Sequence, residues 1–178
     1  MEIKTYVAGP FMTNTYLIIN DKKGIIVDPT IGLEKNIDDI KKINITAILL
    51  THCHIDHIAS AHLFDAPIYM SKIDAINIKD NRINLSNTFG IPFIFPSNNI
   101  IGLDDEVLSL NNLKIECILT PGHTSGGMCF LINDSLFSGD TLFQVGIGRT
   151  DFPTGNMNDL KKSLLKLKCL PKNTKIYP

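Results

Sequence analysis

The feature that most constrains this chain is an apolar run that leads directly into a cluster of histidines. Residues 45–50 read ITAILL, a stretch rich in β-branched and aliphatic residues that predicts a buried β-strand. Residues 51–57 follow without a break and read THCHIDH, so three of the five histidines and one aspartate occupy six consecutive positions. Imidazole and carboxylate groups crowded at a strand end are typical of a divalent metal site.

Alternation along an extended chain gives a first expectation for these side chains. If the chain stays extended after the strand, His52, His54 and Asp56 lie on one side, because extended side chains repeat every two residues. His57 is then expected to open the next helix and point elsewhere, and Cys53 to face away from the metal and be structural. Zinc is favoured by borderline-soft nitrogen ligands. The alternative is a polar loop whose histidines cap a helix and contact water.

Two later segments carry further candidate ligands. Residues 120–126 (TPGHTSG) follow an apolar strand and place His123 in a tight turn at its end. Ser-Gly-Asp at 138–140 also follows an apolar strand, so Asp140 brings a carboxylate to a similar place. Alone, a Gly-His turn is weak support for a site, and aspartate after glycine is a common turn residue. A metal needs three or four protein ligands, which these residues supply together: His52, His54, His123 and Asp140.

Composition limits the remaining possibilities. The chain has 178 residues, 44% of them hydrophobic, which predicts a single globular domain over residues 1–178. A net charge of −1 argues against a nucleic-acid surface. No signal peptide is visible, and no apolar run approaches the roughly 20 residues of a membrane span, so no membrane partner is expected. Scattered cysteines without a Cys-x-x-Cys pair favour a reduced, cytoplasmic protein: Cys53, Cys117, Cys129 and Cys169.

The apolar pattern predicts the secondary structure in outline. Strands are expected at residues 3–7, 15–19, 24–28, 46–50, 67–70, 107–110, 113–119, 127–132, 135–138 and 174–177. Helices are expected at residues 33–43, 57–64, 71–78 with Ser71 as N-cap, and 157–167. Residues 81–105 mix Asn, Pro, Phe and Gly, which predicts a long excursion with little regular structure. Strands followed by a helix occur twice, so two sheets between outer helices are expected.

The three motifs together resemble the metallo-β-lactamase superfamily. His-x-His-x-Asp-His at 52–57, the Gly-His at a strand end and the later Ser-Gly-Asp occur in the family's order, over essentially the whole chain. The segment GIGRTDFP at 146–153 is similar to that of the small glyoxalase-II-like (hydroxyacylglutathione hydrolase-like) branch and of the related persulfide dioxygenases. The resemblance implies an α+β fold, a four-layer αββα sandwich with its metals at one edge.

The resemblance also implies a ligand set. It assigns His52, His54 and His123 to a first metal, Asp56 and His57 to a second, and Asp140 to a bridge between them. The implied cofactor is zinc, as one or two ions, with iron as the other possible metal.

The end of the chain differs from the family pattern. Relatives complete the second metal site with a histidine in a Tyr-Pro-Gly-His stretch after the last strand, and a terminal helix follows. Here residues 175–178 read Lys-Ile-Tyr-Pro and the sequence ends. We therefore expect a C-terminally truncated fold with the last strand and helix incomplete, and an evolved loss is the alternative. In both cases the second site is expected to be weakened.

The leading functional hypothesis is metal-dependent hydrolysis of a small-molecule thioester such as S-acyl-glutathione, through a metal-activated hydroxide. Asp56 is the candidate catalytic group, because it could orient the attacking water or take its proton. The substrate-binding residues and the oligomeric state are left open. The alternatives are a mononuclear iron persulfide dioxygenase that uses His52, His123 and Asp140, and a non-catalytic or damaged metal-binding protein.

Several polar residues near the motifs are candidates for a supporting role. The threonines beside the ligands are expected to orient imidazoles, with plain capping as the alternative: Thr51, Thr124 and Thr141. Arg149 is expected to pair with Asp151 in preference to binding an anionic substrate.

Overall fold

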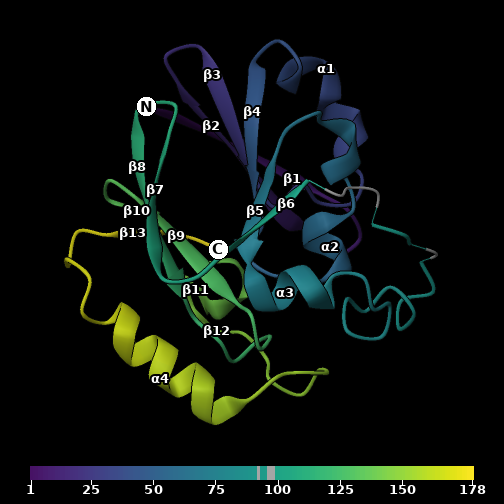
Figure 1. The fold of residues 1–178 in the computed structure, drawn as a ribbon, viewed down its shortest axis with the longest axis vertical. Coiled ribbons are helices and arrows are strands. Elements are labelled where there is room, and N and C mark those ends of the chain that lie inside the picture. The colour runs from purple at the N-terminus through teal and green to yellow at the C-terminus, as the bar shows by residue number, and fades with distance from the viewer. Residues whose placement is uncertain (92, 96–98) are drawn as a thin grey trace.

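Two β-sheets face each other between outer helices in the computed structural model, which describes residues 1–91, 93–95 and 99–178. Helices α1, α2 and α3 lie on the outside of the first sheet, and α4 lies on the outside of the second (Figure 1). The mixed α+β sandwich that the family resemblance implied is therefore confirmed.

The first sheet has six strands in the order β1-β2-β3-β4-β5-β6. Its first three strands pair antiparallel through tight connections, and the pairs from β3 to β6 are parallel. Parallel neighbours need crossover connections, and these carry the helices on the outer face. The strands are β1 (Glu2–Ala8), β2 (Thr13–Asn20), β3 (Lys23–Val27), β4 (Asn44–Leu49), β5 (Ile68–Ser71) and β6 (Ile100–Leu103).

The second sheet has five strands in the order β13-β10-β9-β8-β7. Its pairs are antiparallel except for β10 with β13. A short separate ribbon is formed by β11 and β12. The strands are β7 (Glu106–Leu110), β8 (Leu113–Leu119), β9 (Met128–Ile132), β10 (Ser135–Phe137), β11 (Leu142–Phe143), β12 (Gly146–Ile147) and β13 (Lys175–Tyr177).

The helices agree with the sequence in two cases of four. Helix α4 (Met157–Leu167) has its predicted bounds, and α3 (Lys72–Asn77) begins after Ser71, whose hydroxyl accepts from Asp74 N at 3.1 Å as an N-cap. The continuous helix predicted at 33–43 is wrong. A 3₁₀ turn, η1 (Leu33–Asn36), precedes a short α1 (Ile37–Ile40), because Asn36 between them has φ −107° and ψ 0°. None of the helices in the described part of the chain has the length and apolarity of a membrane span.

The helix predicted at 57–64 also differs. Helix α2 (Ile55–Ile58) starts two residues earlier and ends before Ser60, and a 3₁₀ turn, η2 (Ala61–Leu63), follows. The interruption has a hydrogen-bonding cause, since Ser60 N donates to Pro29 O at 3.0 Å, outside the helix.

The long excursion predicted at 81–105 is partly wrong. Residues Ile100–Leu103 form β6, which pairs in parallel with β5 and completes the first sheet. The strand is short and contains Gly102, so the local pattern gave little sign of it, and pairing with β5 decides its conformation. Residues 92 and 96–98 of the predicted excursion lie outside the described part of the chain.

The core consists of apolar layers on both faces of the first sheet. Leu17 packs toward the helices and its neighbour Ile18 packs between the sheets, because successive side chains of a strand point to opposite faces. Strands buried on both faces therefore read as continuous apolar runs. A third cluster, with Leu136 and Leu167, packs α4 on the second sheet. Each fully buried aliphatic side chain contributes roughly 1.5–3 kcal/mol relative to exposure, so these layers hold the strand ends in fixed positions.

Candidate metal centre

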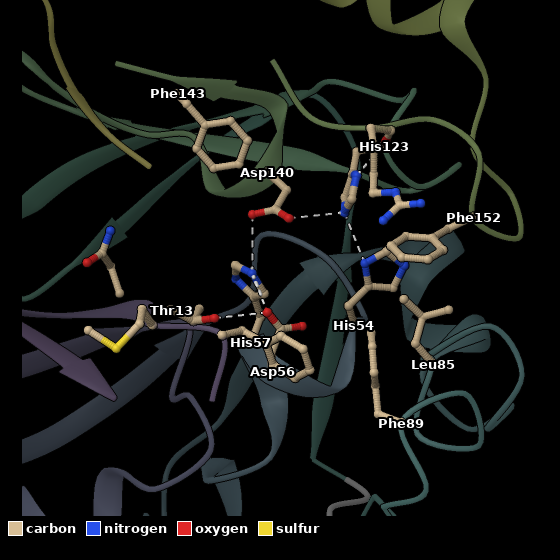
Figure 2. A pocket seen from close by; sticks show the side chains of 14 residues that line it. Thr13, His54, Asp56, His57, Leu85, Phe89, His123, Asp140, Phe143 and Phe152 are labelled. Atoms are coloured by element: carbon tan, nitrogen blue, oxygen red, sulfur yellow. Dashed lines mark hydrogen bonds and ion pairs between the residues drawn. The ribbon is translucent and has the colours of Figure 1, made fainter. Parts of the chain in front are cut away.

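The loops that follow β4, β8 and β10 meet at one edge of the sandwich. They bring together His52 and His54 after β4, His123 after β8 and Asp140 after β10, as the sequence predicted (Figure 2). The ligand atoms of His52, His54 and His123 all lie within 4.8 Å of one another, and so do those of His52, His57 and Asp140. Both sets could hold a metal ion.

The first set, here called the three-histidine group, is His52, His54 and His123. All three side chains are buried, and Nδ1 of His54 lies 3.0 Å from Nε2 of His123. Burial, followed by the charges of neighbouring histidines, lowers the pKa of His52 and the pKa of His54 well below the ordinary value. Neutral imidazole is the form that binds metals, so this environment favours ligation.

Hydrogen bonds fix which nitrogens of this group face the centre. Thr51 Oγ1 donates its one proton to Asp28, so at 3.0 Å from His52 Nδ1 it accepts from that nitrogen. His123 Nδ1 lies 2.7 Å from the Arg149 carbonyl oxygen, which can only accept. Both rings are left with a lone pair on Nε2, the arrangement in which a second hydrogen bond orients a metal-binding histidine.

One observation tests directly whether a metal ion fits here. Nε2 of His52 and Nε2 of His54 are buried and have no hydrogen-bond partner in the described part of the structure. Buried polar atoms without a partner are rare in native proteins. A cation that accepts the His52 lone pair would satisfy that atom, so the residues present fit a bound metal.

A cluster of three carboxylates around His57, here called the acidic group, consists of Asp28, Asp56, His57 and Asp140. His57 Nδ1 lies 2.8 Å from Asp28 Oδ2, and its Nε2 lies 3.3 Å from Asp140 Oδ1 and 3.5 Å from Asp56 Oδ2. The other oxygen of Asp140, Oδ2, lies 3.3 Å from His123 Nε2. Asp140 therefore joins the acidic group to the three-histidine group, with one oxygen facing His57 and the other facing His123 (Figure 2).

Charge in the acidic group is set by its neighbours. Burial opposes a charge on His57, but the carboxylates of Asp56, Asp140 and Asp28 raise its pKa well above the ordinary value. Burial likewise raises the pKa of Asp140, but His57, followed by His123 and His54, outweighs it and lowers that pKa to about 2. The acidic group is thus an ion-paired cluster.

The expected side-chain alternation after β4 ends at His54. Helix α2 begins at Ile55, whose N–H donates to Asn84 O at 2.8 Å, and His57 N donates to His54 O at 3.0 Å. Asp56 and His57 therefore reach the site from the first turn of a helix, and the expectation that His57 points elsewhere is wrong. The interpretation of Cys53 as structural is confirmed, since its side chain is fully buried in the core.

Asp28 is a site residue that the sequence analysis missed. It lies directly after β3 and accepts from Thr51 N at 2.8 Å, from Thr51 Oγ1 at 2.6 Å and from His57. An acidic residue at the end of an apolar strand was the signal used for Asp140, and the same signal was present here. Thr51 has the orienting role predicted for it, toward His52.

Asp74 is the second residue that was missed. Its side chain is fully buried, and its Oδ2 accepts from Cys53 N at 3.1 Å and from Thr124 Oγ1 at 2.7 Å. It thereby ties the loop after β4 to the loop after β8. Thr124 Oγ1 donates to this carboxylate, and Thr141 Oγ1 lies 3.2 Å from Thr120 Oγ1. The direct imidazole contact expected of Thr124 and Thr141 is therefore not found in the described structure.

The GIGRTDFP segment closes the site from the side of the second sheet. A Cβ added to Gly148 would lie 1.7 Å from the Asp140 carbonyl oxygen, so only glycine fits at this approach. The predicted pairing of Arg149 with Asp151 is confirmed, since Arg149 Nε donates to Asp151 Oδ1 at 2.7 Å and Arg149 Nη2 donates to Asp151 Oδ2 at 2.5 Å. The segment therefore contributes a backbone carbonyl to His123 and close packing to Asp140.

A partly open cavity of about 370 Å³ lies over the centre. Its lining includes members of both groups: His54, Asp56, His57, His123 and Asp140. A molecule that enters this cavity would reach the candidate ligands directly.

The sequence model of the metallo-beta-lactamase superfamily matches residues 8–177. The chain belongs to this superfamily. It is similar to the probable polyketide biosynthesis zinc-dependent hydrolase PksB of Bacillus subtilis, with 33% identity over 187 residues, 99% of this chain and 76% of the relative. It is also similar to hydroxyacylglutathione hydrolase GloC of Haemophilus influenzae, with 34% identity over 187 residues, 99% of this chain and 88% of the relative.

Solved structures agree with this placement. The crystal structure of TTHA1623 in a di-iron-bound form matches with a TM-score of 0.86 and 27% identity, over 98% of this chain and 90% of that chain. Named relatives of this superfamily member thus include zinc-dependent hydrolases, and a similar structure holds iron.

Proposed function

We propose that this chain is a metal-dependent hydrolase of thioesters, of which S-acyl-glutathione is the representative. The observation that carries the proposal is the pairing of the buried three-histidine group with the acidic group, joined through Asp140 and open to one cavity. The similarity to hydroxyacylglutathione hydrolase GloC supports the thioester class.

His52, His54 and His123 would hold a first ion, Asp56 and His57 a second, and Asp140 would contact both. Zinc suits this nitrogen-rich set, and the di-iron neighbour makes iron the other candidate. When bound, such an ion polarises a carbonyl and lowers the pKa of water to about 7.

The chain's own side chains would position the reactants. Thr13 Oγ1 donates to Asp56 Oδ2 at 2.9 Å, which orients a carboxylate that lines the cavity. Asp56 would hold the attacking water by a hydrogen bond and take its proton. The leaving thiolate is a weak base, so cleavage requires no strong general acid. Asp28 and Thr51 would keep His57 and His52 in place during this step.

The proposal is tested by thiol release from S-lactoyl-glutathione and other acyl thioesters, with metal content measured on the same sample. We expect turnover that is lost on chelation and in Asp56→Asn, but kept in His62→Ala, an exposed histidine outside the site. A folded, metal-loaded protein that cleaves no thioester would overturn the proposal. Metal content well below one ion per chain, with intact folding, would favour the non-catalytic alternative.

The second candidate is an iron dioxygenase acting on a persulfide. It is favoured by the set His52, His57 and Asp140, a two-histidine, one-carboxylate group like those of non-haem iron oxygenases. The sequence had suggested His123 in place of His57 for this set. Oxygen uptake with glutathione persulfide by the iron-loaded protein, and none by the zinc-loaded protein, would select this function. A cytoplasmic location and the absence of nucleic-acid and membrane partners stay predictions.

A further inference from the structure

The apolar part of the cavity wall comes from separate parts of the chain. Six large apolar side chains line it: Phe11, Met12, Leu85, Phe89, Phe143 and Phe152. Figure 2 shows Phe89, Leu85 and Phe152 on the side of His54, and Phe143 beside Asp140. The polar lining, in contrast, belongs mostly to the candidate metal ligands. A substrate held over the ligands would therefore lie against hydrocarbon.

Two of these residues form an aromatic pair. Phe11, from the turn between β1 and β2, and Phe89, from the segment before β6, have ring centroids 4.6 Å apart. Their side chains are 43% and 37% exposed, although both rings are large and apolar. Exposed apolar groups that cluster beside a cavity mark a surface that binds an apolar partner.

Charge in the cavity is unsuited to an anionic carrier. Arg149 is the single lysine or arginine among the described lining residues, and its guanidinium is paired with Asp151 and stacked on Phe152 at 4.0 Å. The residues outside the described part are Pro92, Pro96, Ser97 and Asn98, which carry no charge. Glutathione carries two carboxylates, and the described lining offers them no unpaired cation.

We infer that this cavity selects the acyl part of its substrate by apolar contact and not the thiol carrier by charge, so its substrates are thioesters of apolar acids. The inference rests on the proposed function for its chemistry. Phe11 and Phe89 are the specificity-determining residues, since their paired rings form the aromatic part of the exposed apolar wall, beside Met12. Each CH₂ group that the wall buries is expected to improve binding by up to about fourfold.

Non-hydrolysable thioethers separate binding from turnover. We would measure by calorimetry the binding of S-methyl, S-butyl and S-hexyl derivatives of glutathione and of the neutral thiol N-acetylcysteamine to the metal-loaded protein. We expect S-hexyl to bind at least about tenfold more tightly than S-methyl for both carriers, since several CH₂ groups become buried. At equal chain length, the two carriers are expected to differ by less than about threefold, as no unpaired charge distinguishes them.

Variants assign the effect to the aromatic pair. Phe89→Ala and Phe11→Ala are expected to reduce the S-hexyl to S-methyl ratio about threefold or more, and Phe89→Leu to keep most of it. Ile76→Ala is the matched control, because Ile76 is an exposed apolar residue of α3 outside the cavity lining. Circular dichroism checks that each variant is folded.

The outcomes distinguish this inference from the proposed hydrolase activity. A flat chain-length series, or a preference of more than about tenfold for the glutathione carrier, would overturn the inference even if thioesters are cleaved. The predicted binding pattern without cleavage of any thioester would support the inference on the cavity and reject the hydrolase. An unchanged ratio in both alanine variants would remove Phe11 and Phe89 from the assignment.

Discussion

The three-histidine group and the acidic group take their histidines largely from one short segment, yet the pKa values of the histidines in that segment shift in opposite directions. His52 and His54 lose their affinity for protons through burial, whereas His57, equally buried, gains it from three surrounding carboxylates. Residue type and position in the motif therefore do not decide the protonation of these rings. Their neighbours from other loops do.

The supports of the two groups differ in the same way. Neutral groups orient the first, namely the Thr51 hydroxyl for His52 and the Arg149 carbonyl for His123. A buried carboxylate, Asp28, orients His57 in the second. We therefore expect activity to depend on the three-histidine group through its candidate ligands. We expect it to depend on the acidic group also through the charge of Asp28, which contacts His57 Nδ1.

The largest effect is expected from breaking the three-histidine group. His123→Ala removes a candidate ligand and leaves a cavity beside His54, so kcat/KM should fall by more than about 100-fold, since even changes to residues outside the ligand set cost about 10–100-fold. Thioester cleavage and metal content after dialysis measure this. His62→Ala is the matched control and should retain both. Retention of metal and activity by the His123 variant would remove that residue from the site.

The second-largest effect is expected from removing the charge of Asp28, which contacts His57 in the acidic group. Asp28→Asn keeps the side-chain size but removes the charge that holds His57 and accepts from Thr51, so kcat/KM should fall about 10–100-fold. Asp65→Asn, at an exposed position, is the control. Equal activity of the two variants would show that charge behind His57 is unimportant, and the contrast between the groups would fail.

Asp74→Asn tests the link between the loops that carry the three-histidine group. The amide weakens acceptance from Cys53 N and Thr124 Oγ1, so the free energy of unfolding should fall by about 2 kcal/mol. Activity should fall by at most about tenfold, because neither contact involves a ligand ring. Denaturant unfolding and kinetics measure the two separately. A loss of activity larger than that of the Asp28 variant would contradict this ranking.

The smallest effect is expected at Thr13, which reaches only the acidic group. Thr13→Val removes the hydrogen bond to Asp56, worth about 1 kcal/mol, so kcat should fall by about three- to fivefold with little change in metal content. Thr13→Ser keeps the hydroxyl and should retain wild-type kcat. A valine variant that keeps the kcat of the serine variant would show that the hydrogen bond to Asp56 does not affect catalysis.

The sequence by itself determined most strands, helix α4 and the placement of the candidate ligands at the strand ends. These depend on residues close together in the chain: apolar runs that end in His52, His123 or Asp140, and a 3.6-residue pattern at 157–167. Strands of both sheets end at this edge of the sandwich, so the residues that follow β4, β8 and β10 meet there, and the candidate ligand set could be proposed before its geometry was known.

Only the tertiary structure decided where helix α2 begins, which carboxylates support the site and what lines the cavity. Helix α2 begins at Ile55, whose N–H donates to the Asn84 carbonyl oxygen. The Asp28–His57 and Asp74–Thr124 contacts join residues that are 29 and 50 positions apart in the sequence. Such contacts are formed by packing of the sheets and loops, and no local pattern encodes them. Protonation of the histidines and the apolar wall of Phe11 and Phe89 follow from the same packing, because burial and neighbouring charge exist only after the chain has folded.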